Sequence, residues 1–516
     1  MLEGERSYQR GQENLVPSNN ASSIPESQVI PKAQEKPWYI QHFTKLLIGF
    51  GLGGGAIALI LPWMLWLFCG MSSGSSDQLR LHLLYVTGGI IAVLTLLQTN
   101  WKNQGDRLKI DADIKKNEQD SEKNERDHIR QVHAERRSRY TKAVEQLANE
   151  KASVRLGGIY TLVGLVDEWL ADDIIDPEER QKEGQVIINN LCSYIRSPFP
   201  LALKAEMFGG DSEPANYEGD FTKDQAAFRE EQDVRRTIFV EMSKRSSDVI
   251  LDDDGKLIDT SLGTWSDFEF DFSRAPIFYP LKNLTIEQGN FASTRFYGKA
   301  DFWGAKFIRN ADFGGARFTG TVLFGVAEFA GTVLFRVAEF AGTIYFGGAK
   351  FTGNADFGGA KFIGDAHFLG AEFTGNAHFL GAKFTGDTDF HGTKFTGDTD
   401  FGGAKFTGNA DFWVAEFTGT ADFRKAEFTS KTSFKSAYFK KYAPPFAGVS
   451  GAARFSAQVN QEDYIFSLSR GSKPINCGTA TLDGKSFEIP IRAVLFDPTS
   501  WDEDKQDYTR ISEPAK

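Results

Sequence analysis

The chain has 516 residues and a formal net charge of −11, and phenylalanine and glycine stand out in its composition, with 45 Phe and 51 Gly. Its three cysteines lie far apart, at positions 69, 192 and 477, and none belongs to a CxxC pair. This excludes a disulfide framework and a zinc site of the usual spacing, and it is the cysteine usage expected in a reducing compartment.

The N-terminal part of the chain is predicted to cross a membrane twice. Residues 1–43 form a polar tail that lacks the apolar core of a signal peptide. Residues 46–69 contain no charged side chain over 24 positions, and residues 81–98 form a second apolar run of 18. Such lengths can span a bilayer, so residues 44–99 are expected to form a transmembrane helical hairpin.

The charges around this hairpin predict its orientation. The loop between the two runs holds one basic residue, Arg80, whereas both outer flanks are rich in Lys and Arg, which the positive-inside rule places in the cytoplasm. Both termini are therefore expected to be cytoplasmic. The small residues Gly51 and Gly55, with Gly88 and Gly89 in the second run, suit either close packing of the hairpin or dimerisation, and packing of the two helices is expected. The flanking cations are Lys32, Lys36 and Lys45 before the first run and Lys102, Arg107, Lys109, Lys115 and Lys116 after the second.

A helical region is predicted between the hairpin and the repeats. Residues 100–139 are densely charged, which predicts a solvated stalk helix, and residues 140–250 are expected to form a small helical domain. A 3.6-residue periodicity begins this domain, and further helices are predicted at 183–196 and 224–246. Residues 267–288 contain apolar residues without the repeat, and residues 251–288 are predicted to cap the N-terminal end of the column that follows.

From residue 289 to 440 the chain is a strict repeat. Phenylalanine returns after alternately five and six residues, so that 28 Phe between Phe291 and Phe439 follow one schedule. Glycine recurs at nearly every corner and would cost an 11-residue helical coiled coil about 1 kcal/mol each time, which argues against that interpretation. A small residue lies two positions before Phe, as in Ala300 and Phe302, so both point to the same side of an extended chain. The units are therefore predicted to be short strands.

Two kinds of residue are expected to shape the corners between these strands. Glycine two positions after Phe is expected to supply positive φ, while Val326, Val337 and Val414 show that some corners lack glycine. The extra residue of each six-residue unit is Asn, Asp or Thr from position 310 to 420, and such side chains can hydrogen-bond a tight corner. The glycines include Gly304, Gly315, Gly353, Gly375 and Gly408.

The run A-x-F-x-G-A-x-F-x-G-x resembles the pentapeptide-repeat family in its Phe-rich form. The resemblance implies a four-sided, right-handed parallel β-helix in which two 5+6 units close one coil, with Phe and the small residue inside. The start of the predicted helical domain is also similar to a segment of membrane-anchored bacterial members, which implies a protein of the bacterial inner membrane. The matching residues there are Tyr140, Thr141, Ala143, Gln146, Leu147, Arg155, Leu156, Gly157, Gly158, Ile159, Tyr160 and Leu162.

The charges offer an independent test of the 22-residue coil. Outward residues taken at intervals of 22 alternate in sign, whereas intervals of 11 would place Lys306 beside Arg317 and Glu328 beside Glu339, which destabilises a sheet. The repeats then make seven coils, roughly 34 Å tall at ~4.8 Å per coil. Residues 441–516, with alternating patterns near 463–496, are predicted to be a C-terminal β-rich cap and tail. The alternating series is Lys306, Glu328, Lys350, Glu372, Lys394 and Glu416.

No pattern in the chain predicts chemistry. The seven His are scattered, and there is no HExxH, nucleophile elbow or phosphate loop, so no catalytic residue, cofactor or small-molecule substrate is expected. The 22-residue register sets His367 beside Asp389 and His378 between Asp356 and Asp400. On a solvated wall this predicts a charge ladder rather than a metal site.

One column of outward residues is the candidate partner-binding surface. The residues after the first Phe of each 22-residue coil include Trp303, Leu369, His391 and Trp413. Exposed aromatic side chains on a rigid wall suit a protein partner, although they could instead lie across the corner glycines as packing.

The sequence therefore predicts a membrane-anchored, non-enzymatic scaffold that presents a β-helix to another protein or to itself. One alternative is a DNA mimic that protects a topoisomerase, as some soluble pentapeptide-repeat proteins do. Residues 289–440 hold 16 Lys and Arg against 15 Asp and Glu, and this near-neutral column disfavours both mimicry and nucleic-acid binding. A second alternative is a membrane-tethered enzyme with a site in the C-terminal cap, which shows no catalytic grouping.

Overall fold

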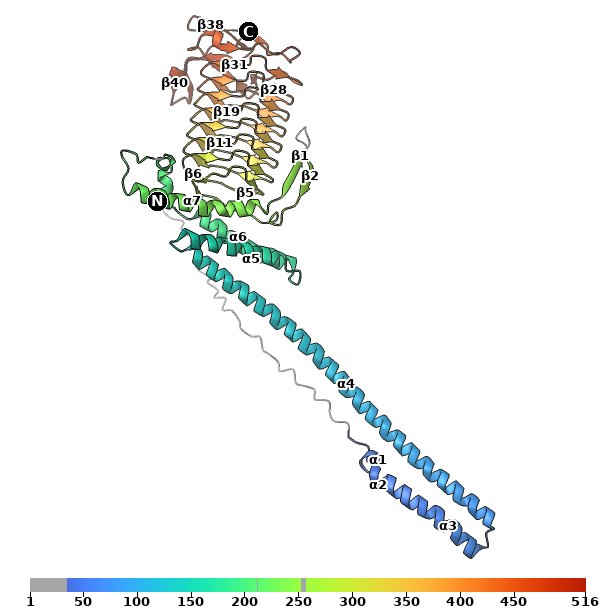
Figure 1. The fold of residues 1–516 in the computed structure, drawn as a ribbon. Coiled ribbons are helices and arrows are strands. Elements are labelled where there is room, and N and C mark those ends of the chain that lie inside the picture. The colour runs from blue at the N-terminus through green and yellow to red at the C-terminus, as the bar shows by residue number, and fades with distance from the viewer. Residues whose placement is uncertain (1–34, 211, 252–256) are drawn as a thin grey trace, which may run out of the picture. The chain divides into compact units, whose positions relative to one another are not determined.

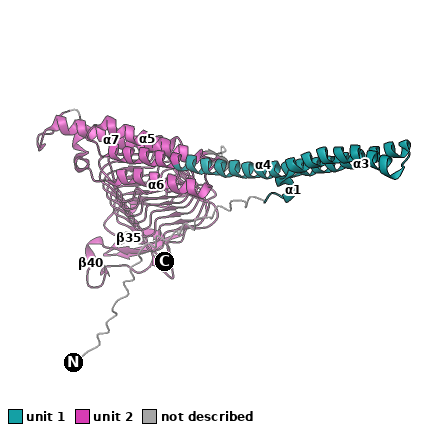
Figure 2. Cartoon of the chain, turned by 90° about the horizontal axis from the view of Figure 1, so that it is seen from below, with its two compact units in different colours: residues 1–130 teal, residues 131–516 magenta. Residues whose placement is uncertain are grey.

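The computed structural model describes residues 35–210, 212–251 and 257–516, and the chain divides into two compact units, residues 1–130 and 131–516 (Figures 1 and 2). One helix, α4 (Ser73–Leu147), begins in the first unit and ends in the second. It runs without interruption through the second apolar run, the predicted stalk and the start of the predicted helical domain. The boundaries predicted at residues 99 and 139 therefore fall within a single helix.

The first unit holds the two apolar helices. Short helices α1 (Trp38–Gln41) and α2 (Phe43–Ile48) lead through a π-helical turn, η1 (Gly49–Gly53), into α3 (Gly54–Cys69). The helical stretch Phe43–Cys69 and α4 are each long and apolar enough to cross a membrane.

The contact between α3 and α4 does not use the predicted glycine pair. A Cβ on Gly54 would lie 2.0 Å from Cγ2 of Thr87, so the absence of a side chain at Gly54 lets the helices meet. A Cβ on Gly51 or Gly55 would have nothing within 4 Å, so the expectation for that pair was wrong.

The second unit begins with a helical layer around an apolar core. Amphipathic helices α5 (Ala152–Leu170), α6 (Pro177–Arg196) and α7 (Phe221–Ser243) follow the end of α4, with 3-10 turns η2 (Pro200–Lys204) and η3 (Met207–Gly209) before α7. Helix α6 starts with Pro177 and is capped by Asp176, whose Oδ1 accepts the Glu178 N–H at 2.9 Å. A hairpin of β1 (Asp248–Leu251) and β2 (Leu257–Ser261) leads to the column.

The column is a parallel β-solenoid with four walls, each named here after its strand in the coil β10–β13. The β10 sheet consists of β3 (Pro276–Ile277), β6 (Arg295–Phe296), β10 (Arg317–Phe318), β14 (Glu339–Phe340), β18 (Lys361–Phe362), β22 (Lys383–Phe384), β26 (Lys405–Phe406), β30 (Glu427–Phe428), β35 (Arg454–Ser456) and β39 (Val494–Phe496). The β11 sheet consists of β7 (Ala300–Asp301), β11 (Val322–Leu323), β15 (Ile344–Tyr345), β19 (Ala366–His367), β23 (Thr388–Asp389), β27 (Ala410–Asp411), β31 (Thr432–Ser433) and β36 (Tyr464–Ile465). The β12 sheet consists of β4 (Thr285–Ile286), β8 (Lys306–Phe307), β12 (Glu328–Phe329), β16 (Lys350–Phe351), β20 (Glu372–Phe373), β24 (Lys394–Phe395), β28 (Glu416–Phe417) and β32 (Tyr438–Phe439). The β13 sheet consists of β5 (Gly289–Asn290), β9 (Ala311–Asp312), β13 (Val333–Leu334), β17 (Ala355–Asp356), β21 (Ala377–His378), β25 (Thr399–Asp400) and β29 (Ala421–Asp422).

The register confirms that two 5+6 units close one coil. Lys350 pairs with Glu372, and Phe351 pairs with Phe373, in adjacent strands of the β12 sheet. The alternating charges form ion pairs across that wall, with Lys394 Nζ 3.0 Å from Glu372 Oε1.

Stacked phenylalanine rings fill the interior. The rings of Phe351 and Phe373 lie parallel with centroids 4.4 Å apart, and neighbouring stacks meet edge to face, as Phe324 and Phe335 do at 5.7 Å. The inward small residues are buried as well, which confirms the pattern predicted for Ala and Phe. Thr388 and Thr399 take the place of an inward Ala, and their buried hydroxyls have no hydrogen-bond partner among the residues that the structure describes.

Glycines at the corners serve two different purposes. Gly304 and Gly315 have φ of 64° and 63°, as predicted, and Val337 at an equivalent corner adopts 50° without being glycine. Gly353, by contrast, does not have positive φ. A Cβ there would lie 2.2 Å from the Gly331 carbonyl oxygen of the preceding coil. The same holds for Gly375 and Gly408, so the predicted positive φ was wrong for these three glycines, which are needed for close approach.

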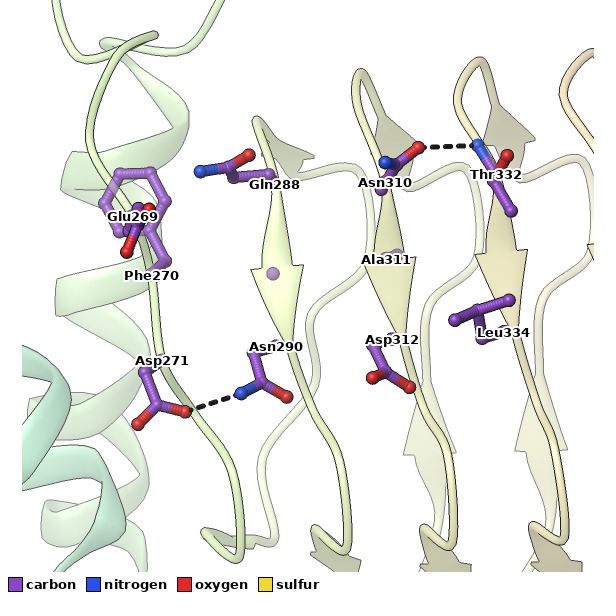
Figure 3. Close-up of a pocket in the computed structure, with 11 residues that line it drawn as sticks. Glu269, Phe270, Asp271, Gln288, Asn290, Asn310, Ala311, Asp312, Thr332 and Leu334 are labelled. Carbon is purple, nitrogen blue, oxygen red and sulfur yellow. Dashed lines mark hydrogen bonds between the residues drawn. The ribbon is translucent and has the colours of Figure 1, made fainter.

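The extra Asn, Asp and Thr residues link one coil to the next. Asn310 Oδ1 accepts the backbone N–H of Thr332 at 3.0 Å, as the dashed line in Figure 3 shows. The same bond runs from Asn376 to the N–H of Asp398 and from Asp398 to the N–H of Thr420. These side chains thus form a ladder along the column, and each bonds the corner above it rather than its own.

Both ends of the column are covered. At the N-terminal end Phe239 of α7 packs on Phe272 with centroids 4.6 Å apart, and Phe272 stacks on Phe291 of the first regular coil. The predicted cap therefore contains an irregular first coil with β3 and β4, and helix α7 lies beneath it (Figure 1).

At the C-terminal end β35, β36 and β39 extend two walls, and the hairpin of β37 (Cys477–Leu482) and β38 (Lys485–Pro490) places Phe487 6.0 Å from Tyr464. The remaining elements there are β33 (Ala447–Gly448), β34 (Gly451–Ala452), η4 (Gln461–Asp463), η5 (Pro498–Ser500), β40 (Trp501–Asp502) and β41 (Asp507–Tyr508).

Candidate functional site

The four candidate partner-binding residues lie along one edge of the β11 sheet, whose strands β11, β19 and β31 follow one another along the column (Figure 1). Trp303, Leu369, His391 and Trp413 each follow an inward Phe and occupy the same corner position in different coils. Trp303, Leu369 and Trp413 are 49%, 50% and 41% exposed, and His391 is half-buried. Leu369, His391 and Trp413 belong to consecutive coils, whereas Trp303 lies three coils below Leu369.

Trp303 packs against the wall and is exposed at the same time. A Cβ on Gly325 would lie 2.3 Å from Cζ3 of Trp303, so the indole covers that glycine of the next coil. The Trp303 backbone N–H donates to Oδ1 of Asp301 at 3.1 Å, which fixes the turn that carries the ring. Half of the indole surface nevertheless remains open to solvent, so packing and partner contact are compatible for this residue.

His391 and Trp413 form a stacked pair. Their ring centroids are 4.5 Å apart with an interplanar angle of 25°, and Nζ of Lys435 lies 6.0 Å from the Trp413 ring centroid. Both corners are built alike, because Asp389 accepts the His391 N–H at 2.8 Å and Asp411 accepts the Trp413 N–H at 3.0 Å. The two stacked rings therefore form an aromatic surface whose position is fixed by the backbone turns that carry them.

Three more apolar residues on this side were missed in the sequence. Tyr345 on β15, Val326 and Val414 are 39%, 48% and 40% exposed. The sequence signal was present, because Tyr345 occupies the outward position before Phe and the valines follow the candidate column by one residue. We call the whole set the aromatic stripe. It consists of Trp303, Val326, Tyr345, Leu369, His391, Trp413 and Val414.

A column of polar and charged residues borders the stripe. Tyr345 stacks on His367 with centroids 4.9 Å apart, and Nδ1 of His367 lies 4.0 Å from Oδ2 of Asp389. Asp301 and Asp411 continue this column of the β11 sheet, and Oδ2 of Asp301 lies 3.8 Å from Nζ of Lys299. The border beside the aromatic rings therefore carries charges of both signs.

The structure confirms the neighbours predicted for His367 and His378 in adjacent coils. His367 pairs with Asp389 on the β11 sheet, and on the β13 sheet His378 pairs with Asp400 and with Asp356. Asp356 also lies 2.5 Å from Nε of Arg336. Within the described ranges, no group of three or more His, Cys, Asp or Glu is placed to hold a metal ion.

The thiol of Cys192 is held in an unreactive form. It is fully buried in the helical layer, and this burial raises the pKa of Cys192 to about 12. Because the thiolate is the nucleophile, a thiol with so high a pKa is a poor one at neutral pH.

Comparison with known proteins supports the assignment of the repeat. A family model described as pentapeptide repeats (9 copies) matches residues 368–415. Neither the curated proteins nor the solved structures include a match to the chain.

Proposed function

Because its column is a pentapeptide-repeat β-solenoid, we propose that this chain is a membrane-anchored, non-catalytic scaffold that presents the column for protein–protein interaction. The aromatic stripe is the observation that carries this proposal. Aromatic side chains dominate the energetics of protein interfaces, and a rigid wall presents them with little conformational cost.

The geometry of the stripe suits an extended partner. Its members occupy successive coils at ~4.8 Å intervals, and the backbone beneath them is fixed by inter-coil hydrogen bonds. Asp389 and Asp411 beside the rings favour a partner whose contact surface is apolar with basic neighbours. A second copy of this chain is the alternative partner, with Arg317, Lys383 and Lys405 on its β10 sheet as basic residues.

Anchoring rests on the two apolar helices. Phe43–Cys69 and the apolar part of α4 are long enough to span a bilayer, and the Lys and Arg residues outside them favour cytoplasmic termini in a bacterial inner membrane. A cysteine introduced at Ser75 in a Cys69→Ser background tests the orientation in intact cells, because a membrane-impermeant maleimide should label it from outside. Labelling of the Ser75→Cys variant only after cell lysis would contradict it.

Neither alternative function gains support from the site. DNA mimicry needs an acidic column, yet residues 289–440 are nearly neutral. The enzyme alternative places its site in the C-terminal cap, where burial raises the pKa of the Cys477 thiol to about 11, so this thiol is a poor nucleophile at neutral pH.

Photo-crosslinking in cells tests the scaffold proposal. A photoreactive amino acid replaces Leu369 in one variant and His391 in another, and a matched control replaces Lys350 on the β12 wall at a similar height. Discrete adducts are expected from the two stripe positions and not from the control, and the Trp413→Ala substitution should weaken them. An adduct of twice the chain mass identifies self-association, and recovery of a topoisomerase supports mimicry. Identical adducts from all three positions would contradict a specific surface.

A further inference from the structure

The β10 sheet is the basic wall of the column. Its outward residues include six cations and two carboxylates, an imbalance hidden by the near-neutral total of the whole repeat region. The β12 wall across the column alternates evenly in sign instead. The charged residues of the β10 wall are Arg295, Arg317, Glu339, Lys361, Lys383, Lys405, Glu427 and Arg454.

The N-terminal end of this wall holds two arginines in register, Arg295 and Arg317. Glu339 lies in register with Arg317 on the next strand, and its Oε2 lies 3.8 Å from Nζ of Lys361. Neither Arg295 nor Arg317 has an acidic partner in the part of the chain that the structure describes. Adjacent like charges destabilise a sheet, so two arginines in register on neighbouring strands are a place where a bound anion would relieve repulsion.

A groove opens beside Arg295. It has a volume of about 660 Å³, and its polar lining residues are Arg196, Arg274, Ser293, Arg295 and Tyr297. Arg196 bonds Asp271, with Nη1 2.8 Å from Oδ2, whereas within the described ranges no carboxylate pairs with Arg274. All polar side chains that line the groove can donate hydrogen bonds, and none of the lining residues is acidic.

The other residues that line the groove are apolar. Phe199 stacks on Phe278 with centroids 5.0 Å apart, and Leu203 beside it is 72% exposed. Pro198, Pro200 and Pro276 complete the apolar lining, and Pro276 lies in register with Arg295. The groove thus contains three guanidinium groups together with a small apolar surface. It suits a ligand that has an anionic group and an apolar moiety.

A second groove, along the β13 wall, lacks the guanidinium groups of the first. That groove, about 330 Å³ in volume, is lined by the carboxylates of Glu269, Asp271 and Asp312 together with amides (Figure 3). It lies at the same end of the column, yet it would repel an anion.

We infer that the Arg274–Arg295 groove is a binding site for the phosphate group of a phosphate ester that carries an apolar moiety. Phosphate oxygens accept the parallel N–H bonds of a guanidinium fork, and a doubly charged group can engage more than one Arg. The apolar moiety would rest on Phe199 and Leu203. This chemistry is shared by a soluble phosphate ester and by the headgroup of an anionic phospholipid.

The test uses the full chain held in nanodiscs of phosphatidylcholine. Calorimetric titration with phenyl phosphate and with inorganic phosphate measures the soluble source, and flotation with vesicles of phosphatidylcholine, with and without phosphatidic acid, measures the lipid source. Arg274→Gln and Arg295→Gln should each weaken binding roughly tenfold or more, and Arg295→Lys should weaken it less because only the fork is lost. Lys350→Gln on the β12 wall removes the same charge elsewhere and should leave binding unchanged. Hydrogen exchange of the column confirms that each variant is folded.

Each outcome either supports or overturns the inferred phosphate site. Saturable binding of phenyl phosphate, tighter than that of inorganic phosphate and lost in Arg295→Gln, supports the site with a soluble ligand. Flotation that requires phosphatidic acid and Arg295 supports it with a lipid ligand. Absence of both, or an equal loss in Lys350→Gln, would overturn the inference, because the attraction would then be general or nonexistent.

Discussion

The two kinds of corner glycine predict different responses to one methyl group. In Gly353→Ala the new Cβ would lie 2.2 Å from the Gly331 carbonyl oxygen, whereas ordinary contacts begin at 3.4 Å. The two coils must therefore move apart by about 1.2 Å at this point, which would break the neighbouring bond from the Thr352 N–H to the Phe329 carbonyl, now 2.9 Å. One lost hydrogen bond, about 1 kcal/mol, and overpacking of about 1–3 kcal/mol give an expected loss of roughly 2–4 kcal/mol.

Two matched variants separate the causes of this loss. Gly370 has φ of 62° and nothing within 4 Å of an added Cβ, so Gly370→Ala should cost about 1–2 kcal/mol through the left-handed backbone alone. Gly347 has neither positive φ nor a close neighbour, the nearest atom being the Leu369 carbonyl oxygen at 3.8 Å. Gly347→Ala should therefore be neutral or stabilising by about 0.4–1 kcal/mol.

Hydrogen exchange on the full chain in nanodiscs measures the local opening free energy of each coil. The order of destabilisation should be Gly353→Ala, then Gly370→Ala, then Gly347→Ala, with faster exchange centred on residues 329–353 for the first. If Gly353→Ala exchanged no faster than Gly370→Ala, the close-approach argument would be refuted.

Three further predictions concern buried and ladder residues. Thr399→Ala should stabilise the column by about 1 kcal/mol in denaturant unfolding because it removes an unpaired buried hydroxyl, whereas Thr393→Ala, which deletes a 2.8 Å bond to the Phe368 carbonyl, should not. Hydrogen bonds from the backbone N–H and the hydroxyl of Thr420 lower the pKa of Asp398 below its ordinary value of 3.8. The ionised Asp398 should therefore stabilise the column above about pH 4, and this stabilisation should fade as the pH falls through the lower pKa of the folded state. Asp398→Asn keeps the acceptor oxygen and should remove this dependence from the unfolding profile between pH 2 and 7, and a wild-type profile identical to that of Asp398→Asn would contradict it. Cys192, with its pKa raised to about 12 by burial, should react with maleimide at pH 8 only after unfolding in a Cys69→Ser/Cys477→Ser background, and rapid labelling of the native chain would disprove its burial.

The column could be predicted from the sequence because its rules are local and repeated. The Phe schedule specifies which side chains point inward, and the alternation of Lys350 and Glu372 specifies which residues are neighbours. The irregular coil that contains β3 and β4 was harder to recognise, because Ile277 and Ile286 replace Phe there and the spacing changes.

The details that failed depend on the distance between coils. Gly304 and Gly353 both stand in F-x-G, but Gly304 lies in a five-residue unit and Gly353 in a six-residue unit. The prediction treated the two corners alike, whereas the first is left-handed and the second approaches the preceding coil closely. A similar reason explains why the total charge of the repeats concealed the basic β10 wall. The sum over four walls is insensitive to the wall on which each residue lies, and the groove beside Arg295 also needs Phe199 and Leu203 from the distant helical layer.

The pairing of two 5+6 units in every coil restricts how the column could change length. Removal of one whole coil, for example positions 355–376, would shorten the column by one coil. Each strand would then pair with a strand of the same wall, so every wall would stay continuous. Removal of a single 5+6 unit would instead rotate everything above the cut by half a turn and set the β12 series on top of the β10 series. The basic side and the aromatic side would then each be broken in two. Insertions or deletions of whole 22-residue coils are therefore the changes that leave the basic wall and the aromatic stripe continuous.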